Sequence, residues 1–265
     1  MAQEIVKLYN DTIELLYKET AKTHSYWVDG RRITGATTPL GVINKPGLLY
    51  WSANSAVDYV LDKWKPGVAY DELYINDTCQ TARKAHVAKK DKAATKGSLV
   101  HDWIHEYIKY MIAIRQRHND TIPEPPKAMT NKELQEKANS IIRWFKETNF
   151  SPHFTERKVL SLKHWIAGTL DTEGMMGQWP TIIDFKNSSG IYPEMKLQLS
   201  CYISCRYEES QITYPSSWIV RIGDEGEIET YEMPWKEVQA HFEAFLHAKA
   251  LYEHLQAMNK EARDG

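Results

Sequence analysis

An acid and a base stand two residues apart within the apolar segment PTIIDFKNSSG, residues 180 to 190. Asp184 and Lys186 flank Phe185 there, although burying either charge alone is costly. Residues two apart on a strand project from the same face, so we expect Ile183 and Phe185 to pack on the opposite face from the two charges. The pattern fits either a structural pair at a strand end or a site that uses both charges.

A second carboxylate, Asp171, lies upstream in AGTLDTEG. A hairpin through GMMGQWP would bring Asp171 beside Asp184. Two neighbouring carboxylates raise one another's pKa unless a cation lies between them. Mg²⁺ commonly uses one or two carboxylates together with substrate phosphates. The spacing therefore predicts a divalent-cation site with Lys186 as a fixed positive charge at its rim.

Further polar residues occur in the same order along the chain. His101 lies in KGSLVHDWIHEY, four residues after Gly97, and Glu156 lies in TERKV. Gln198 and Tyr202, in QLSCY, are four apart and so share one face of a predicted helix.

This order of GTLD, DFK and QLSCY resembles the PD-(D/E)XK nuclease superfamily and, more narrowly, its RecB-like branch. That branch adds a His in a Gly-x-x-x-His context and a Gln-x-x-x-Tyr after the lysine strand, and the likeness spans roughly residues 96 to 203. The resemblance implies that His101, Asp171 and Asp184 ligate Mg²⁺ or Mn²⁺ together with the Phe185 carbonyl.

The resemblance also implies roles for the remaining residues. Lys186 would position the attacking water and stabilise charge on the phosphate, while Gln198 and Tyr202 would hold Lys186 and a substrate phosphate. Glu156 would be a catalytic acid next to the ligands or at a second metal. Ser188 either donates to a backbone phosphate or is an ordinary loop residue.

The chain departs from the family in two respects. Leu170, not Pro, precedes Asp171, and three cysteines exclude the four-cysteine iron–sulfur cluster of some relatives. A different metal site is conceivable at His101 and His105, which would grip zinc from one helical face. Zinc proteases with this spacing need Glu after the first His, and here it is Asp102.

Composition limits the remaining classes. The 265 residues are 42% apolar and 26% charged, as in an ordinary soluble protein, and no run approaches the length of a membrane span. Three cysteines without a CxxC and an N-terminus unlike a secretion signal favour a reducing, cytoplasmic location. The net charge is −2, yet TARKAHVAKKDKAATKG holds six Lys or Arg against one Asp, which fits either a solvated helix face or a nucleic-acid patch. Most of the many aromatic residues should belong to the core, but Tyr50, Trp51 and Trp64 in the N-terminal part could stack on unpaired bases.

Periodicity predicts an α/β (α+β) fold, a mixed central sheet flanked by helices with a restriction-endonuclease-like core. We expect one nuclease domain over residues 1–265, mainly helical to residue 95. The predicted helices cover residues 3–19, 46–64, 71–89, 97–116, 130–146, 192–209 and the C-terminal segment from Trp235. A hairpin at Asp29-Gly30, three strands from residue 154 and two strands after residue 215 complete the pattern.

The resemblance predicts a metal-dependent DNA exonuclease that functions in recombination, repair or replication. Its expected partner is DNA, and no membrane partner is expected. A structure-specific or restriction-like endonuclease and a non-catalytic nucleic-acid-binding protein with a nuclease fold are the alternatives. A compact chain without a motor suits a phage-type enzyme, with a single-strand-annealing or recombination protein as candidate partner; the oligomeric state is left open.

Overall fold

The computed structural model describes residues 2–20, 23–116 and 124–264. The chain divides into two compact units, Met1–Ile43 with Val100–Gly265 and, separately, Asn44–Leu99. The single nuclease domain expected from the sequence stays a prediction. None of the helices in the described ranges is long and apolar enough to cross a membrane.

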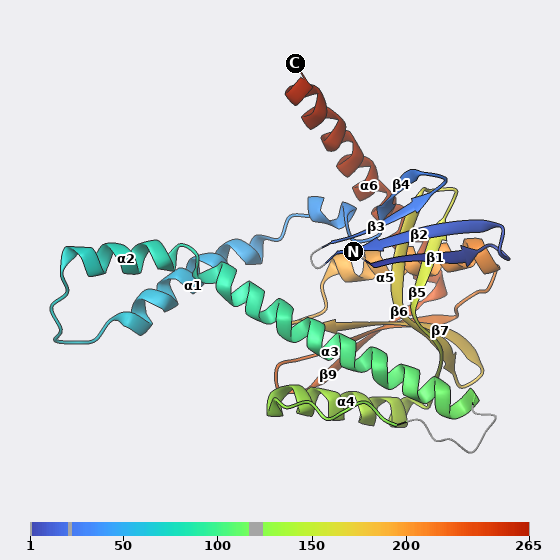
Figure 1. Ribbon diagram of the computed structural model, residues 1–265, viewed down its shortest axis with the longest axis horizontal. Coiled ribbons are helices and arrows are strands. Elements are labelled where there is room, and N and C mark those ends of the chain that lie inside the picture. The colour runs from blue at the N-terminus through green and yellow to red at the C-terminus, as the bar shows by residue number, and fades with distance from the viewer. Residues whose placement is uncertain (1, 21–22, 117–123, 265) are drawn as a thin grey trace. The chain divides into compact units, whose positions relative to one another are not determined.

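A mixed sheet forms the centre of the larger unit (Figure 1). Its strands run in the order β1-β2-β3-β4-β6-β7-β8-β9, and β5 pairs with β6 outside this path. The β4–β6 and β7–β8 pairs are parallel, and the other pairs are antiparallel. The strands are β1 (Ala2–Leu8), β2 (Ile13–Glu19), β3 (His24–Val28), β4 (Arg31–Gly35), β5 (Phe150–Ser161), β6 (Ile166–Met176), β7 (Trp179–Asn187), β8 (Ser216–Ile222) and β9 (Ile228–Pro234).

Helices cover both faces of this sheet, as predicted. One apolar core joins Ile182 of β7 to α5 (Pro193–Ser210) and α6 (Trp235–Asp264). A second core joins Ile183 and Phe185 to α4 (Lys132–Thr148) and to the part of α3 (Ala85–Gln116) that follows residue 99. Because neighbouring residues of β7 face different cores, Asp184 shares the side of Ile182.

The helix predicted for residues 3–19 is wrong. The segment forms the β1–β2 hairpin, and Leu15 is fully buried in a core beneath it. Tyr9, Asn10 and Asp11 all adopt positive φ at the turn, between 52° and 64°. Asn and Asp tolerate this left-handed conformation better than most residues, so local turn chemistry overrides a spacing that also fits a helix. The predicted hairpin at Asp29-Gly30 is confirmed, with positive φ at both residues.

The smaller unit is helical and contains α1 (Pro46–Lys63), α2 (Glu72–Ala82) and the first part of α3. Asp71 caps α2 by accepting a hydrogen bond from the Tyr74 amide. The helix predicted to reach Lys89 ends at Ala82 instead, and α3 begins at Ala85 rather than at Gly97. In the larger unit, the cap of α4 is Asn131 rather than Thr130, and the loop predicted before it lies partly outside the described residues.

Candidate metal centre

The β6–β7 hairpin brings the two predicted strand acids together. The strands pair Thr172 with Ile183, so Asp171 and Asp184 are the next residues along each strand. The Asp171 Oδ2 atom accepts a hydrogen bond from the Phe185 amide at 2.7 Å. The hairpin predicted from the spacing is therefore confirmed, and Phe185 anchors it by packing its ring in the core beneath.

A group of three side chains that could hold a metal ion lies at this hairpin. His101 of α3, Glu156 of β5 and Asp171 of β6 each offer a ligand atom, and these atoms lie within 4.8 Å of one another. The His101 Nε2 atom is 3.0 Å from Asp171 Oδ1, and Nδ1 is 3.5 Å from Glu156 Oε1. One imidazole nitrogen and two carboxylate oxygens form a donor set that could hold a divalent metal ion.

Glu156 reaches this group through an unusual backbone conformation. Its φ of 50° lies in the left-handed region, inside a strand of extended residues. A non-glycine residue held in a sparsely populated region costs on the order of 1–3 kcal/mol, and such residues cluster at functional sites. Lys158 supports the distorted segment by donating a hydrogen bond to the Glu156 carbonyl. The outlier suggests that placing this carboxylate matters more than local stability.

Asp184 and Lys186 form the second half of the site. Their charged atoms are 2.5 Å apart, and Asp184 is almost fully buried. The contact is made by Asp184 Oδ2, which has Lys186 Nζ as its ion-pair partner but, among the described residues, no hydrogen bond of normal geometry. Burial raises the pKa of Asp184 to about 6, with Asp171 adding to the shift and Lys186 opposing it. Burial also opposes the charge of Lys186, but Asp184 and Asp171 outweigh it and raise the pKa of the lysine.

The protonation of the remaining groups reflects their crowding. The charge and hydrogen bond of Asp171 raise the pKa of His101 to about 9. Burial works against ionised Asp171, but His101 and Lys186 hold its pKa below the ordinary value. Burial and then the Asp171 charge raise the pKa of Glu156. Three carboxylates thus share one lysine and a protonated histidine, a balance that a divalent cation in place of the imidazole proton would improve.

Gln198 and Tyr202 share one face of α5, as predicted from their spacing, and both are buried. Gln198 Nε2 donates to the Tyr202 hydroxyl at 2.8 Å. The Tyr202 ring lies so close to β6 that a Cβ at Gly168 would sit 2.6 Å from it, which explains the glycine in AGTLD. Burial, then Asp184 and Asp171, raise the pKa of Tyr202, so the phenol lies within the field of the site. A contact from this pair to Lys186 stays a prediction.

The other predicted binding residues lie elsewhere. Ser188 donates to the Gly190 carbonyl at 2.9 Å, which is what an ordinary loop serine would do. Tyr50 and Trp51 belong to the smaller unit, where 75% and 38% of their surfaces are exposed. Their role in stacking stays a prediction.

Two features of the site were not anticipated from the sequence. His105 Nδ1 lies 2.8 Å from the Thr155 hydroxyl, which donates to the Asp171 carbonyl. This series of hydrogen bonds supports the backbone at Asp171, a candidate metal ligand. It also gives His105 a role other than zinc binding. The second is a buried ion-pair network at Glu173, two residues after Asp171. Its helical member, Arg206, follows Tyr202 by four residues, a spacing that could have marked it.

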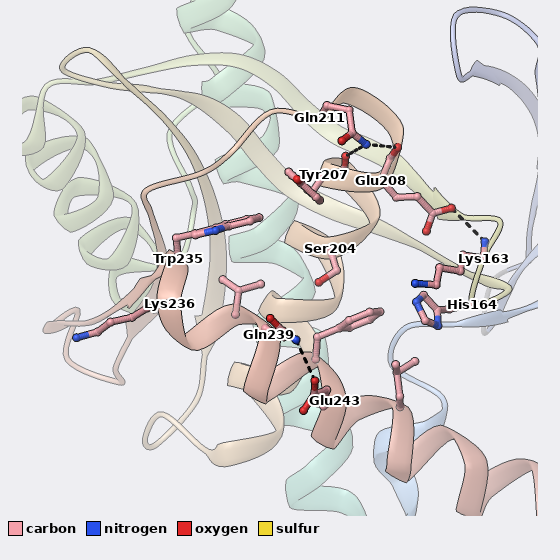
Figure 2. Close-up of a pocket in the computed structure, with 13 residues that line it drawn as sticks. Lys163, His164, Ser204, Tyr207, Glu208, Gln211, Trp235, Lys236, Gln239 and Glu243 are labelled. Atoms are coloured by element: carbon pink, nitrogen blue, oxygen red, sulfur yellow. Dashed lines mark hydrogen bonds between the residues drawn. The ribbon is translucent and has the colours of Figure 1, made fainter.

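The larger unit also has a pocket of about 540 Å³ between α5, α6 and the β5–β6 turn (Figure 2). None of the predicted site residues lines it. Glu208 at its edge accepts hydrogen bonds from the amides of Leu162 and Lys163, so this carboxylate fastens the turn to α5.

No family model matches the sequence, and no curated protein matches it. Among solved structures, the protein SSO0001 matches with a TM-score of 0.31 and 17% identity over 45% of this chain and 56% of that one. An alkaline exonuclease, LHK-Exo from Laribacter hongkongensis, matches with a TM-score of 0.30 and 16% identity over 58% of this chain and 85% of that one. The same exonuclease in complex with dAMP gives a TM-score of 0.30 and 17% identity over the same shares. Likenesses this distant carry no functional weight, so function rests on the site itself.

Proposed function

We propose that this protein is a metal-dependent DNA exonuclease that hydrolyses phosphodiester bonds. The observation that carries the proposal is the meeting of His101, Glu156 and Asp171 beside the buried Asp184–Lys186 pair. The acids and the histidine could bind a cation, and the buried lysine beside them could bind a phosphate. The choice of an exonuclease over an endonuclease rests on the resemblance to the RecB-like branch.

His101, Glu156 and Asp171 would hold Mg²⁺ or Mn²⁺, with Asp184 and the Phe185 carbonyl as further ligands. The β6–β7 pairing places Asp184 beside Asp171 for this role, although its Oδ2 atom is the one that pairs with Lys186 at 2.5 Å. A bound divalent cation would lower the pKa of water and neutralise phosphate charge.

The protein's own groups complete the chemistry. Lys186 would stay protonated, because its pKa is raised, and would stabilise negative charge that develops on the phosphate. The His101 proton must leave before the imidazole can act as a ligand. Gln198 and Tyr202 would orient Lys186 and a phosphate oxygen from a preformed, buried pair.

The smaller unit would bind the DNA strand. It contains nine Lys or Arg against six Asp or Glu, whereas the chain as a whole carries a net charge of −2. Tyr50 and Trp51 add exposed aromatic surface, and stacking of bases on such rings combines with backbone electrostatics in strand binding.

The proposal is tested with purified protein, Mg²⁺ or Mn²⁺, and linear DNA labelled at either end. We expect release of nucleotides from an end, and loss of this release in Lys186→Ala and in Asp184→Ala. Lys249→Ala is the matched control, because Lys249 pairs with Glu253 within α6, and it should keep full activity.

Full cleavage by Lys186→Ala would overturn the mechanism. Cleavage of closed circular DNA would identify an endonuclease instead. Metal-independent DNA binding with no cleavage of any substrate would identify a binding protein that keeps the nuclease fold.

A further inference from the structure

Buried charges also meet on the side of β6 that contacts α5. Glu173, two residues after Asp171, and Arg206 of α5 are both buried. Arg206 Nε donates to Glu173 Oε2 at 3.0 Å, and Nη2 donates to Oε1 at 3.2 Å. Such a two-pronged contact fixes orientation as well as distance, because the guanidinium fork and the carboxylate are both planar.

The remaining bonding capacity of this carboxylate is also used. Tyr214 donates to Oε1 at 2.6 Å, and Arg157 of β5 lies 3.3 Å from Oε2. Arg206 is further paired with Glu209 one turn along α5. Ionic groups buried in this way are poor stabilisers compared with apolar residues of similar size, so their value lies in the geometry that they impose.

The location of Arg206 connects this geometry to the proposed reaction. Gln198, Tyr202 and Arg206 are spaced at successive intervals of four, so they lie along one face of α5. The Tyr202 ring contacts β6 at Gly168, and Arg206 contacts β6 at Glu173. Two contacts at different points along α5 fix both its axial position and its rotation against the strand that carries Asp171.

The geometry points to Glu173 and Arg206 as positioning residues that hold α5 in the register at which Gln198 and Tyr202 serve the Asp184–Lys186 site. This inference rests on the proposed nuclease function. Neither residue belongs to the candidate metal ligands, so loss of the pair should affect turnover and leave metal binding intact.

The test compares Arg206→Lys with Arg157→Lys. Both keep a positive charge near Glu173 and both lose a guanidinium, but only Arg206 is on α5. We expect Arg206→Lys to lower kcat roughly 10- to 100-fold, because small misplacements of catalytic groups have effects of this size. Its KM and its Mn²⁺ affinity should change less than about twofold, and Arg157→Lys should keep kcat within about twofold. Assays run well below the unfolding temperature of each variant keep all of them folded.

Equal kcat for Arg206→Lys and the wild type, or equal losses in both variants, would overturn the positioning role. Amide hydrogen exchange separates this inference from the nuclease proposal. Arg206→Lys should speed exchange in α5 relative to β6 and β7, and Arg157→Lys should not. A wild type without nuclease activity would overturn the proposed function. Unchanged exchange in α5 of the Arg206→Lys variant would overturn the positioning role of Glu173 and Arg206.

Discussion

Two clusters of buried charge lie two residues apart on β6, one at Asp171 and one at Glu173. At Glu173, both carboxylate oxygens meet donors from Arg206, and each also meets a second donor, from Tyr214 or Arg157. At Asp171, three carboxylates crowd around one histidine and one lysine. The buried Oδ2 atom of Asp184 pairs there with the Lys186 ammonium, without a hydrogen bond of normal geometry within the described part of the chain.

The difference separates structural from chemical uses of charge. A satisfied network holds one arrangement and leaves its carboxylate nothing further to bind. The crowded cluster instead drives pKa values apart, with Asp184 raised to about 6, mainly by burial, and His101 raised to about 9 by Asp171. Groups with strongly shifted pKa values cluster at functional sites, where a bound ligand can neutralise the excess charge.

The largest expected effect is on stability at the satisfied network. Glu173→Gln removes the anion shared by two guanidinium groups and leaves the buried Arg206 with Glu209 as its remaining acidic partner. Breaking a buried ion pair from one side costs about 3–5 kcal/mol, so we expect a loss of this order in the free energy of unfolding. Urea unfolding with a fluorescence probe measures it, and Mn²⁺ affinity measured on the folded fraction should stay at the wild-type value. A stability unchanged within error would show that the network is not what holds α5 to β6.

The opposite outcome is expected at the crowded cluster. Asp184→Asn should leave the free energy of unfolding within about 1 kcal/mol of the wild type. Burial already disfavours the Asp184 anion, and Asp171 remains as a second negative charge that stabilises the charged Lys186. DNA cleavage should fall at least roughly 10²-fold, as when one group that stabilises transition-state charge is removed. Single-turnover assays with Mn²⁺ measure this. A variant that is strongly destabilised but still cleaves would reverse the comparison between the two clusters.

Much of the sheet could be predicted from local sequence. The β6–β7 hairpin follows from alternating apolar residues and a glycine turn, in which Gly177 adopts positive φ. The β1–β2 hairpin could not, because Ile5, Leu8 and Ile13 suit a helical face as well as a strand. Only the turn residues distinguish a hairpin from a helix here, and the spacing of apolar residues takes no account of them.

The members of the site could be predicted from the sequence, but only part of their grouping could. Asp171, Asp184 and Lys186 lie together on the β6–β7 hairpin, as expected, and His101 of α3 lies beside Asp171. The sequence does not show that Glu156 joins His101 and Asp171, because this depends on a positive φ inside a strand. Whether these residues bind metal stays a prediction. Arg206 was overlooked because its partner Glu173 is distant in sequence.

The pH dependence of metal affinity distinguishes the clusters further. A cation that binds His101 must displace the imidazole proton, and Asp171 raises the pKa of that imidazole to about 9. Mn²⁺ affinity should therefore rise by up to about tenfold per pH unit as pH increases toward 9. Calorimetric titrations in buffers of different ionisation enthalpy measure both the affinity and the proton released. His101→Gln should flatten the slope, Glu173→Gln should not, and an affinity independent of pH would exclude His101 as a ligand.

The smallest expected effect is on the metal-free protein. Because the pKa of His101 is raised from 6.5 to about 9 by Asp171, the folded state binds the extra proton between these values. The stabilisation is complete below pH 6.5 and is lost as pH rises through about 9. The His101 side chain is 37% exposed, so solvent screening reduces the change in unfolding free energy to on the order of 1 kcal/mol. Urea unfolding in EDTA at pH 6.5 and pH 9.5 measures it, with His101→Gln losing the dependence. Glu173→Gln should give a curve that is lower yet parallel to that of the wild type, and a changed slope would mean that the two clusters act as one.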